Sequence, residues 1–342
     1  MSRMDISLFG VAAFAAAAVA AGAAPAQTPP TYGVIGRIAA PDGGFDYASF
    51  DPAHRRVYVS RTGGVLALDV DTRQVVGHLA DAQKAHESLP LDSGATLLVT
   101  DSGSNSAHLV DALNGQLLAD IPAGQKPDAA LFDPATGLAM VMNGHSGDVT
   151  LIDPQTRKAV GAIPVGGALE FAVADGLGRV FVNIEDQNQI AVLDTRARAV
   201  VGRYALKSCE GPTGLAYAAD RGVLIAACAN KTAKVIRAAD GEDLATLAIG
   251  AGPDAVIYDA ARHLAFIPCG QDGLLEVLDL RAPGGVAIVQ SLKTQRGARV
   301  GALDPRSGDL YLPTASYAPS PTGGRPIAQP GTFTILVVGP GR

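Results

Sequence analysis

The chain has 342 residues and a formal net charge of −6 at pH 7, with 18% of its residues charged and 40 glycines. An acidic chain without basic runs does not favour nucleic-acid binding, because phosphate recognition needs clustered Lys and Arg. Abundant glycine with few charged residues is typical of many short strands joined by tight turns.

The first 26 residues have the pattern of a secretory signal peptide. Arg3 precedes an apolar run from Leu8 to Ala24, and Ala24-Pro25-Ala26 supplies small residues for cleavage after Ala26. A transmembrane anchor is the alternative, but the run is alanine-rich and ends in small residues. We therefore expect a signal peptide (1–26), one exported domain (27–342) without a membrane span, and a bacterial periplasmic or secreted location.

A repeat of about 42 residues fills the rest of the chain. Residues 126–167 show one copy, with four short apolar segments separated by polar turns. The residue that ends the third segment recurs at steps of 41 to 43 residues, as Asp69, Asp111, Asp153, Asp194, Arg237 and Asp279. A second marker opens the first segment seven times, as Asp46, Glu87, Asp128, Glu170, Thr213, Asp254 and Arg299. Four antiparallel strands at this period predict an all-β fold, a seven-bladed β-propeller.

The two ends of the repeat region are complementary. Residues 32–39 resemble a fourth strand without its first three, whereas residues 299–303, 310–314 and 333–338 supply three strands without a fourth. We expect the N-terminal strand to complete the last blade and close the ring, which removes exposed strand edges. Residues 318–331, rich in proline and glycine, interrupt this blade and predict either a solvated loop or a lid.

The strand pairs VYVSRTGGVLALD, VFVNIEDQNQIAVLD and AMVMNGHSGDVTLID resemble the repeat of bacterial YVTN-type β-propellers. The chain contains no tryptophan, so the WD dipeptide of WD-repeat propellers is missing. The resemblance covers the repeats and implies an exported propeller with a binding role. It carries no catalytic motif that can be transferred to residues of this chain, and fold alone does not give function.

The start of each first strand lies on one face of a propeller, so the second marker set should gather around the mouth of the central channel. The residues that we expect to bind a ligand there are Asp46, His86, Glu87, Asp128, His145, Glu170, Asp254 and Arg299. Hard cations such as Ca²⁺ or Mg²⁺ prefer carboxylate oxygens, and Glu87, Asp128 and Glu170 are the predicted metal ligands. His86 and His145 could add imidazoles for a transition metal. In the structural alternative, the acids accept hydrogen bonds from adjacent blades and hold the ring together.

Three cysteines fall in neighbouring repeats. Cys209 and Cys228 lie at facing positions of the fifth repeat, and an exported chain favours a disulfide between them, with Cys269 free. The alternative is a three-cysteine site for a soft metal.

Three functions remain open on the sequence, and the last of them is a metal-delivery or redox partner that uses the cysteines. The first is a monomeric binding or scaffold module that uses its channel mouth to hold a small molecule or a periplasmic protein. The alternative is a divalent-metal-dependent lactonase or lyase, similar in architecture to gluconolactonase-type propellers, with the metal at the acidic mouth. The chain has no G-x-S-x-G, H-E-x-x-H or glycine-rich phosphate motif, which favours the binding module.

Overall fold

The computed structural model describes Met1 and residues 29–282, 285–320 and 326–341. The predicted signal peptide therefore lies outside the described residues, apart from Met1. Within the described part of the chain, no helix is long and apolar enough to cross a membrane. Apart from two short 3₁₀ turns, Asp92–Gly94 and Glu185–Gln187, the regular structure consists of β-strands.

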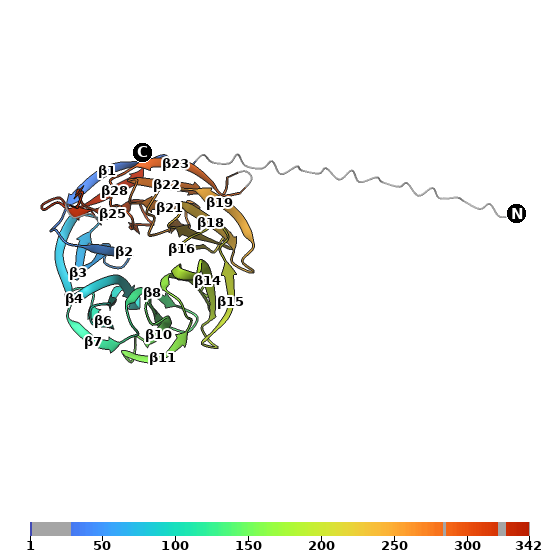
Figure 1. Ribbon diagram of the computed structural model, residues 1–342, viewed down its shortest axis with the longest axis horizontal. Coiled ribbons are helices and arrows are strands. Elements are labelled where there is room, and N and C mark those ends of the chain that lie inside the picture. Colours follow the sequence, from blue (N-terminus) through green and yellow to red (C-terminus); the bar gives the residue numbers. More distant parts are fainter. Residues whose placement is uncertain (2–28, 283–284, 321–325, 342) are drawn as a thin grey trace.

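The strands form antiparallel sheets that follow one another along the chain. Four of them contain four consecutive strands: β8 (Pro127–Asp133), β9 (Leu138–Asn143), β10 (Asp148–Asp153) and β11 (Lys158–Pro164); β12 (Leu169–Ala174), β13 (Arg179–Ile184), β14 (Gln189–Asp194) and β15 (Ala199–Ala205); β16 (Pro212–Ala218), β17 (Val223–Cys228), β18 (Thr232–Arg237) and β19 (Asp243–Ala248); β20 (Ile257–Asp259), β21 (Leu264–Cys269), β22 (Leu274–Asp279) and β23 (Ala287–Lys293). Figure 1 shows the sheets in a ring, with first strands such as β8 and β16 nearest the centre and last strands such as β11 and β19 at the rim.

The chain between residues 45 and 122 forms one six-stranded sheet. Its strands are β2 (Phe45–Asp51), β3 (Arg56–Asp69), β4 (Gln74–Leu91), β5 (Thr96–Asp101), β6 (Ser106–Asp111) and β7 (Leu117–Pro122). β4 pairs with β3 through residues 74–84 and with β5 through residues 85–91. The described residues therefore form six large sheets, where the repeat predicts seven blades, because β3 and β4 continue through positions where the other repeats have breaks.

The remaining large sheet combines the two ends of the chain in the order β1-β28-β25-β24. Its strands are β1 (Tyr32–Ala39), β24 (Ala302–Leu303), β25 (Leu310–Thr314) and β28 (Thr334–Pro340). β1 pairs antiparallel with β28 from Tyr32↔Pro340 to Ala39↔Thr334. The interrupting segment contains a small hairpin of β26 (Tyr317–Ala318) and β27 (Ile327–Ala328), so part of the predicted irregular loop is paired.

Apolar side chains are concentrated in the middle strands of each sheet. All six residues of β17 are buried, whereas the outer strand β15 alternates between exposed and half-buried positions. A middle strand is covered by neighbouring sheets on both faces, while an outer strand has one face in water. Val57, Met140, Phe181 and Leu336 are among the fully buried residues of this core.

The repeated aspartate at the end of the third strand closes the next turn. Asp153 Oδ1 accepts the backbone N–H groups of Gln155 and Thr156, and Arg157 then takes a left-handed conformation with φ of 57°. A carboxylate that accepts backbone N–H groups two and three residues later stabilises a turn. The same bond to the residue two or three positions later recurs at Asp69, Asp111, Asp194 and Asp279. The first marker of the repeat is therefore structural.

Candidate functional site

In five of the repeats, a β-bulge at the start of the first strand places the residue of the second marker set. The pairing of first and second strands skips two residues after Phe45, Ala85, Pro127, Leu169 and Pro212. Bulges turn side chains out of the normal alternation of a strand. The first skipped residues are Asp46, His86, Asp128, Glu170 and Thr213. The marker position of the second repeat thus belongs to His86, and Glu87, which we assigned there from the sequence, is one residue further on.

Charged residues from five of the six large sheets form one continuous row, which we call the charged row. Acids and bases alternate along it in the order Asp254, Arg299, Asp46, His86, Asp128, Lys126 and Glu170. The sixth sheet contributes Thr213, whose hydroxyl donates to the backbone oxygen of Pro253 at 3.1 Å. The sequence predicted a mainly acidic ring. The structure instead interleaves three bases with four acids, so most of the negative charge is compensated.

Arg299 and Lys126 connect the two ends of the charged row to its centre. Arg299 lies 2.7 Å from Asp254 and 3.6 Å from Asp46, and it donates to the backbone oxygen of Phe45 at 2.9 Å. Lys126 Nζ lies 2.9 Å from Asp128 Oδ2 and 3.7 Å from Glu170 Oε1. Each inner carboxylate therefore has one oxygen on a fixed cation and the other directed at His86.

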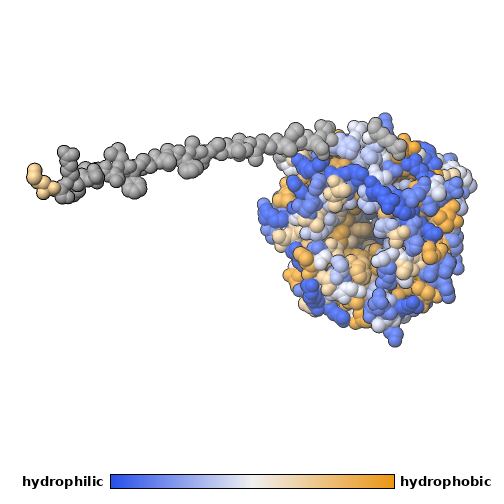
Figure 2. All heavy atoms as spheres, turned by 180° about the vertical axis from the view of Figure 1, so that it is seen from behind, coloured by the Kyte–Doolittle hydropathy of each residue, from blue (hydrophilic) through white to orange (hydrophobic). Residues whose placement is uncertain are grey.

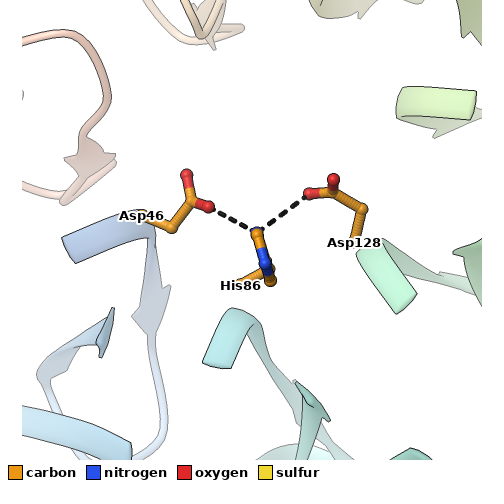
Figure 3. Close-up of side chains that lie close together, drawn as sticks. All are labelled: Asp46, His86 and Asp128. Atoms are coloured by element: carbon orange, nitrogen blue, oxygen red, sulfur yellow. Dashed lines mark ion pairs between the residues drawn. The ribbon is translucent and has the colours of Figure 1, made fainter. Parts of the chain in front are cut away.

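His86 occupies the middle of the row (Figure 3), and its side chain is buried. Its Nε2 hydrogen-bonds with Ser102 Oγ at 2.8 Å. Its Nδ1 lies 2.5 Å from Asp46 Oδ2 and 3.4 Å from Asp128 Oδ1, but neither oxygen lies in the direction needed for a hydrogen bond. A buried ring nitrogen thus faces two carboxylate oxygens without a hydrogen bond of good geometry.

The protonation of the row follows from burial and from these contacts. Burial alone would lower the pKa of His86, but its contacts with Asp128 and Asp46 outweigh burial and raise that pKa to about 9. Burial opposes ionisation of Asp128 as well, yet His86 and Lys126 hold the pKa of Asp128 below its usual value. Burial raises the pKa of Glu170 to about 8, with a further contribution from Asp128.

Two other acids near the row also have raised pKa values. Burial raises the pKa of Glu87 to about 8 and that of Asp254 to about 6, although Arg299 opposes the second shift. Glu87 has its own contacts beside the row: its Oε1 accepts the N–H of Ser88, and its N–H donates to Thr100 Oγ1 at 2.9 Å. Acids with a raised pKa therefore lie next to His86, as Glu87 does, and at both ends of the row, as Glu170 and Asp254 do.

Seven of the eight residues that we predicted to bind a ligand lie in or beside the charged row, and one lies elsewhere. Asp46, His86, Asp128, Glu170, Asp254 and Arg299 belong to the charged row, and Glu87 is buried next to it. His145 is exposed in the turn between β9 and β10, where its N–H donates to the backbone oxygen of Gln125. The structure does not bring His145 to His86 and Asp128.

Lys126 is the residue of the row that the sequence analysis missed. It lies two positions before Asp128, has a left-handed φ of 55°, and is the only lysine that contacts the row within the described chain. The proximity of a basic residue to a marker acid was the available signal. That signal is weak, because most basic residues near an acid on a strand end are solvated.

The described residues contain one group of three side chains with metal-ligand geometry. Its ligand atoms come from Asp46, His86 and Asp128 and lie within 4.8 Å of one another. Of the three carboxylates predicted to hold a hard cation, only Asp128 belongs to this triad, and of the two predicted imidazole ligands only His86 does. One imidazole with two carboxylates suits a transition metal such as Zn²⁺ or Mn²⁺ better than Ca²⁺ or Mg²⁺, which prefer all-oxygen sites.

The cysteine prediction is confirmed. Cys209 and Cys228 form a disulfide with an S–S distance of 2.06 Å, and Cys269 is free and buried. Burial raises the pKa of the Cys269 thiol to about 12. With two of the three sulfurs bonded to each other, the alternative of a three-cysteine metal site is wrong.

Antiparallel four-stranded blades arranged around a common centre define a β-propeller, and the face shown in Figure 2 is hollowed at that centre. A chain of Kuenenia stuttgartiensis hydrazine synthase is similar at a TM-score of 0.68 and 16% identity, over 79% of this chain and 92% of that chain. A chain of the mitotic checkpoint complex is similar at a TM-score of 0.71 and 14% identity, over 90% and 95% of the two chains. At these identities the likeness concerns the fold alone.

Sequence relatives cover less of the chain. The proteins named YncE from Salmonella typhimurium and Salmonella typhi are each 30% identical over 118 residues, which is 33% of this chain and 33% of each relative. The match thus spans about a third of the length of these curated relatives. No family model matches the chain.

Proposed function

We propose that this protein is an exported binding module, and that its ligand binds at the centre of the propeller face that carries the charged row. The observation that supports this function most directly is the environment of His86. Its buried Nδ1 faces oxygens of both Asp46 and Asp128 without a hydrogen bond of good geometry. A metal cation between these three groups would coordinate all of them and take the place of the proton that the imidazole otherwise holds.

The simplest ligand with this chemistry is a divalent cation held by the Asp46–His86–Asp128 triad. Ser102 would then accept the N–H of His86 Nε2, which fixes the ring and leaves Nδ1 free to coordinate. Arg299 and Lys126 hold the outer oxygens of the two carboxylates in place. Each of these contacts orients a ligand atom toward the centre of the triad.

The first experiment is calorimetric titration of chelator-treated mature protein with Zn²⁺, Mn²⁺, Ca²⁺ and Mg²⁺. We expect Zn²⁺ or Mn²⁺ to bind with one-to-one stoichiometry and more tightly than Ca²⁺ or Mg²⁺. The Asp128→Asn variant removes one ligand charge and should weaken binding at least tenfold, or about 1.4 kcal/mol. Its melting temperature should also fall, because His86 and Lys126 lose their shared partner.

Asp254→Asn is the matched control. It removes a carboxylate from the same charged row, paired with Arg299, without touching the triad. Both variants change the net charge equally, so a general electrostatic effect would weaken metal binding in both. Equal weakening in the two variants, or no saturable binding of any of the four ions, would contradict the metal site.

A second candidate function is a metal-dependent lactonase or lyase. Glu170 and Glu87 favour it, since carboxyl groups with a pKa near neutrality can donate or accept a proton during catalysis. In that case the metal-loaded protein hydrolyses or eliminates small lactones, and Glu170→Gln lowers kcat while metal affinity persists. A panel of lactone substrates, followed by pH-stat titration, tests this activity.

We also propose the finer features of the architecture and location. The six-stranded sheet counts as two repeat units joined within β4, which gives seven units, and β1 closes the ring against β28. The disulfide and the N-terminal pattern support export to the periplasm as a monomer, with a small molecule or another periplasmic protein as partner. N-terminal sequencing of the protein recovered from periplasmic extract should begin at residue 27.

A further inference from the structure

Arg61 lies in β3, close to the charged row but outside it. It is the cross-strand partner of Phe45, whose ring lies under the guanidinium of Arg299 at 4.9 Å. The side chain of Phe45 also contacts that of Phe333, with ring centroids 5.5 Å apart. Arg61 in turn lies over the Phe333 ring at 4.8 Å. Two guanidinium groups thus flank a pair of aromatic rings on the same part of the molecule.

The guanidinium of Arg61 is buried without a polar partner. The residue is only 8% exposed, and its Nε is buried with no hydrogen bond. Within the described chain, no carboxylate lies within ion-pair distance of it. Other half-buried arginines have a polar partner: Arg55, Arg179, Arg262 and Arg299 each pair with a carboxylate, and Arg56 donates to the backbone oxygen of Ala112.

The surroundings hold the guanidinium in place but do not neutralise it. Gly43 packs so closely that a Cβ at this position would lie 2.0 Å from Nη2 of Arg61. The charge of Asp42 acts on Arg61 from a greater distance. The Asp42 carboxylate itself accepts the N–H groups of Gly331 at 2.5 Å and Phe333 at 3.2 Å, so it is committed to that segment.

A buried and unpaired cation is unfavourable unless something else compensates it. The aromatic ring of Phe333 supplies part of that compensation. Nε is enclosed, whereas the two terminal nitrogens keep some access to solvent, because they are not among the fully enclosed polar atoms. A planar guanidinium with accessible terminal nitrogens matches the two oxygens of a carboxylate or phosphate.

We propose that Arg61 is an anion-binding residue that takes the carboxylate or phosphate group of a small ligand. This site is chemically opposite to the Asp46–His86–Asp128 triad and does not depend on a metal. Arg61 shares the six-stranded sheet with Asp46 and His86 of the triad, so one ligand with an anionic group could use Arg61 while a cation occupies the triad. Arg61 would then give the binding face its preference for anionic molecules.

The test is calorimetric titration of the mature protein with inorganic phosphate, acetate and glycerol phosphate. We expect saturable one-to-one binding of phosphate or acetate, and at least tenfold weaker binding in Arg61→Gln. Arg306→Gln is the control, since Arg306 is an exposed arginine and the same charge is removed. If glycerol phosphate binds as tightly as inorganic phosphate, the natural ligand is a larger molecule with an anionic group. If only inorganic phosphate binds, the natural ligand is a free anion.

Stability supplies an independent readout. Without anion, Arg61→Gln should melt at the same temperature as wild type or higher, because an unpaired buried charge is removed. Phosphate should raise the melting temperature of wild type and not that of the variant. Gly43→Ala displaces the guanidinium while keeping its charge, and it should weaken anion binding as well. Should Arg61→Gln not fold, Gly43→Ala alone decides the question.

Two outcomes overturn the proposal: no saturable binding of any of the three anions, or equal binding in wild type and the Arg61 and Gly43 variants. The Asp128→Asn variant separates this site from the proposed metal site. If Asp128→Asn still binds the anion, the anion site belongs to Arg61 and does not depend on the triad. Loss of anion binding in Asp128→Asn, with Arg61 intact, would place the anion on a bound metal instead and also overturns the proposal.

Discussion

The carboxyl group of Glu170 keeps its proton at neutral pH. Burial, reinforced by the charge of Asp128, raises its pKa from 4.5 to about 8, against the opposing effect of Lys126. The folded protein therefore holds a proton that the unfolded chain releases above about pH 4.5. Linkage then requires that this residue makes the protein less stable as the pH rises between the two values.

Glu170→Gln should remove this pH dependence, because glutamine does not ionise. The melting temperature of the variant should rise relative to that of wild type between pH 5 and pH 8. Each pH unit in this window corresponds to at most about 1.4 kcal/mol of unfolding free energy. Thermal melts of both proteins across the pH range measure the difference. Glu210→Gln, at an exposed glutamate, is the control, and a constant difference between Glu170→Gln and wild type contradicts the prediction.

At the scale of elements, the disulfide joins the end of β17 to the connection that precedes β16. Cys228 ends β17, and Cys209 lies just before β16, so the bond closes a loop with a sequence separation of 19. Replacing both cysteines by alanine should lower the unfolding free energy by about 3 kcal/mol, because the unfolded chain regains the freedom of this loop. Denaturant unfolding with and without a reducing agent measures the loss. Reduction should destabilise wild type and leave the double variant unchanged.

The repeat made most elements predictable, because turns depend on local chemistry. Asp153 and its equivalents close turns with N–H groups two or three residues away, so a single-sequence pattern identifies them. The bulges were not predictable in the same way. Sequence spacing and acid chemistry favoured Glu87 as the marker, whereas strand pairing places His86 in the bulge. That choice depends on which residue of β5 each residue of β4 faces, and spacing alone does not determine register.

The charged row was predictable in part for a related reason. The face on which the acids gather follows from the repeat, but several of their partners come from other sheets. Lys126 reaches Glu170 across a sheet boundary, and Arg299 reaches Asp46 from the other end of the chain. The sequence analysis also missed the continuity of β3 and β4, because a Gly-Gly pair, such as the one within β3, usually indicates a break between strands. Contacts between distant segments decide these features.

At the scale of the whole molecule, β1 ties the first residues of the domain to its last strand. Besides pairing with β28, it contacts the neighbouring sheet: Tyr32 N donates to Gln290 Oε1 at 2.9 Å, and Gln290 Nε2 donates to the Tyr32 backbone oxygen at 2.8 Å. The Tyr32 ring also packs against Phe266 at 4.8 Å. β1 thus joins two sheets, and its removal exposes the edge of β28.

Deleting residues 32–39 should cost several kcal/mol of unfolding free energy, because a strand of hydrogen bonds and two buried side chains, Tyr32 and Ile38, are lost together. We expect the melting temperature to fall by about 5 °C or more. Calorimetry of the truncated and the complete mature protein provides the comparison. Fusing residues 27–31 directly to residue 40 keeps the start of the chain unchanged in the truncated protein. A fall in melting temperature of less than about two degrees would contradict the role of β1.

The charged row joins residues from position 46 to position 299, so it forms only when nearly the whole chain has been assembled. Contacts of such long sequence separation carry a large loop-closure cost, which delays their formation during folding. Interactions that form after the transition state slow unfolding and leave the folding rate almost unchanged. The row therefore acts on the lifetime of the assembled ring, because opening the ring requires that oppositely charged and only partly exposed groups of neighbouring sheets separate.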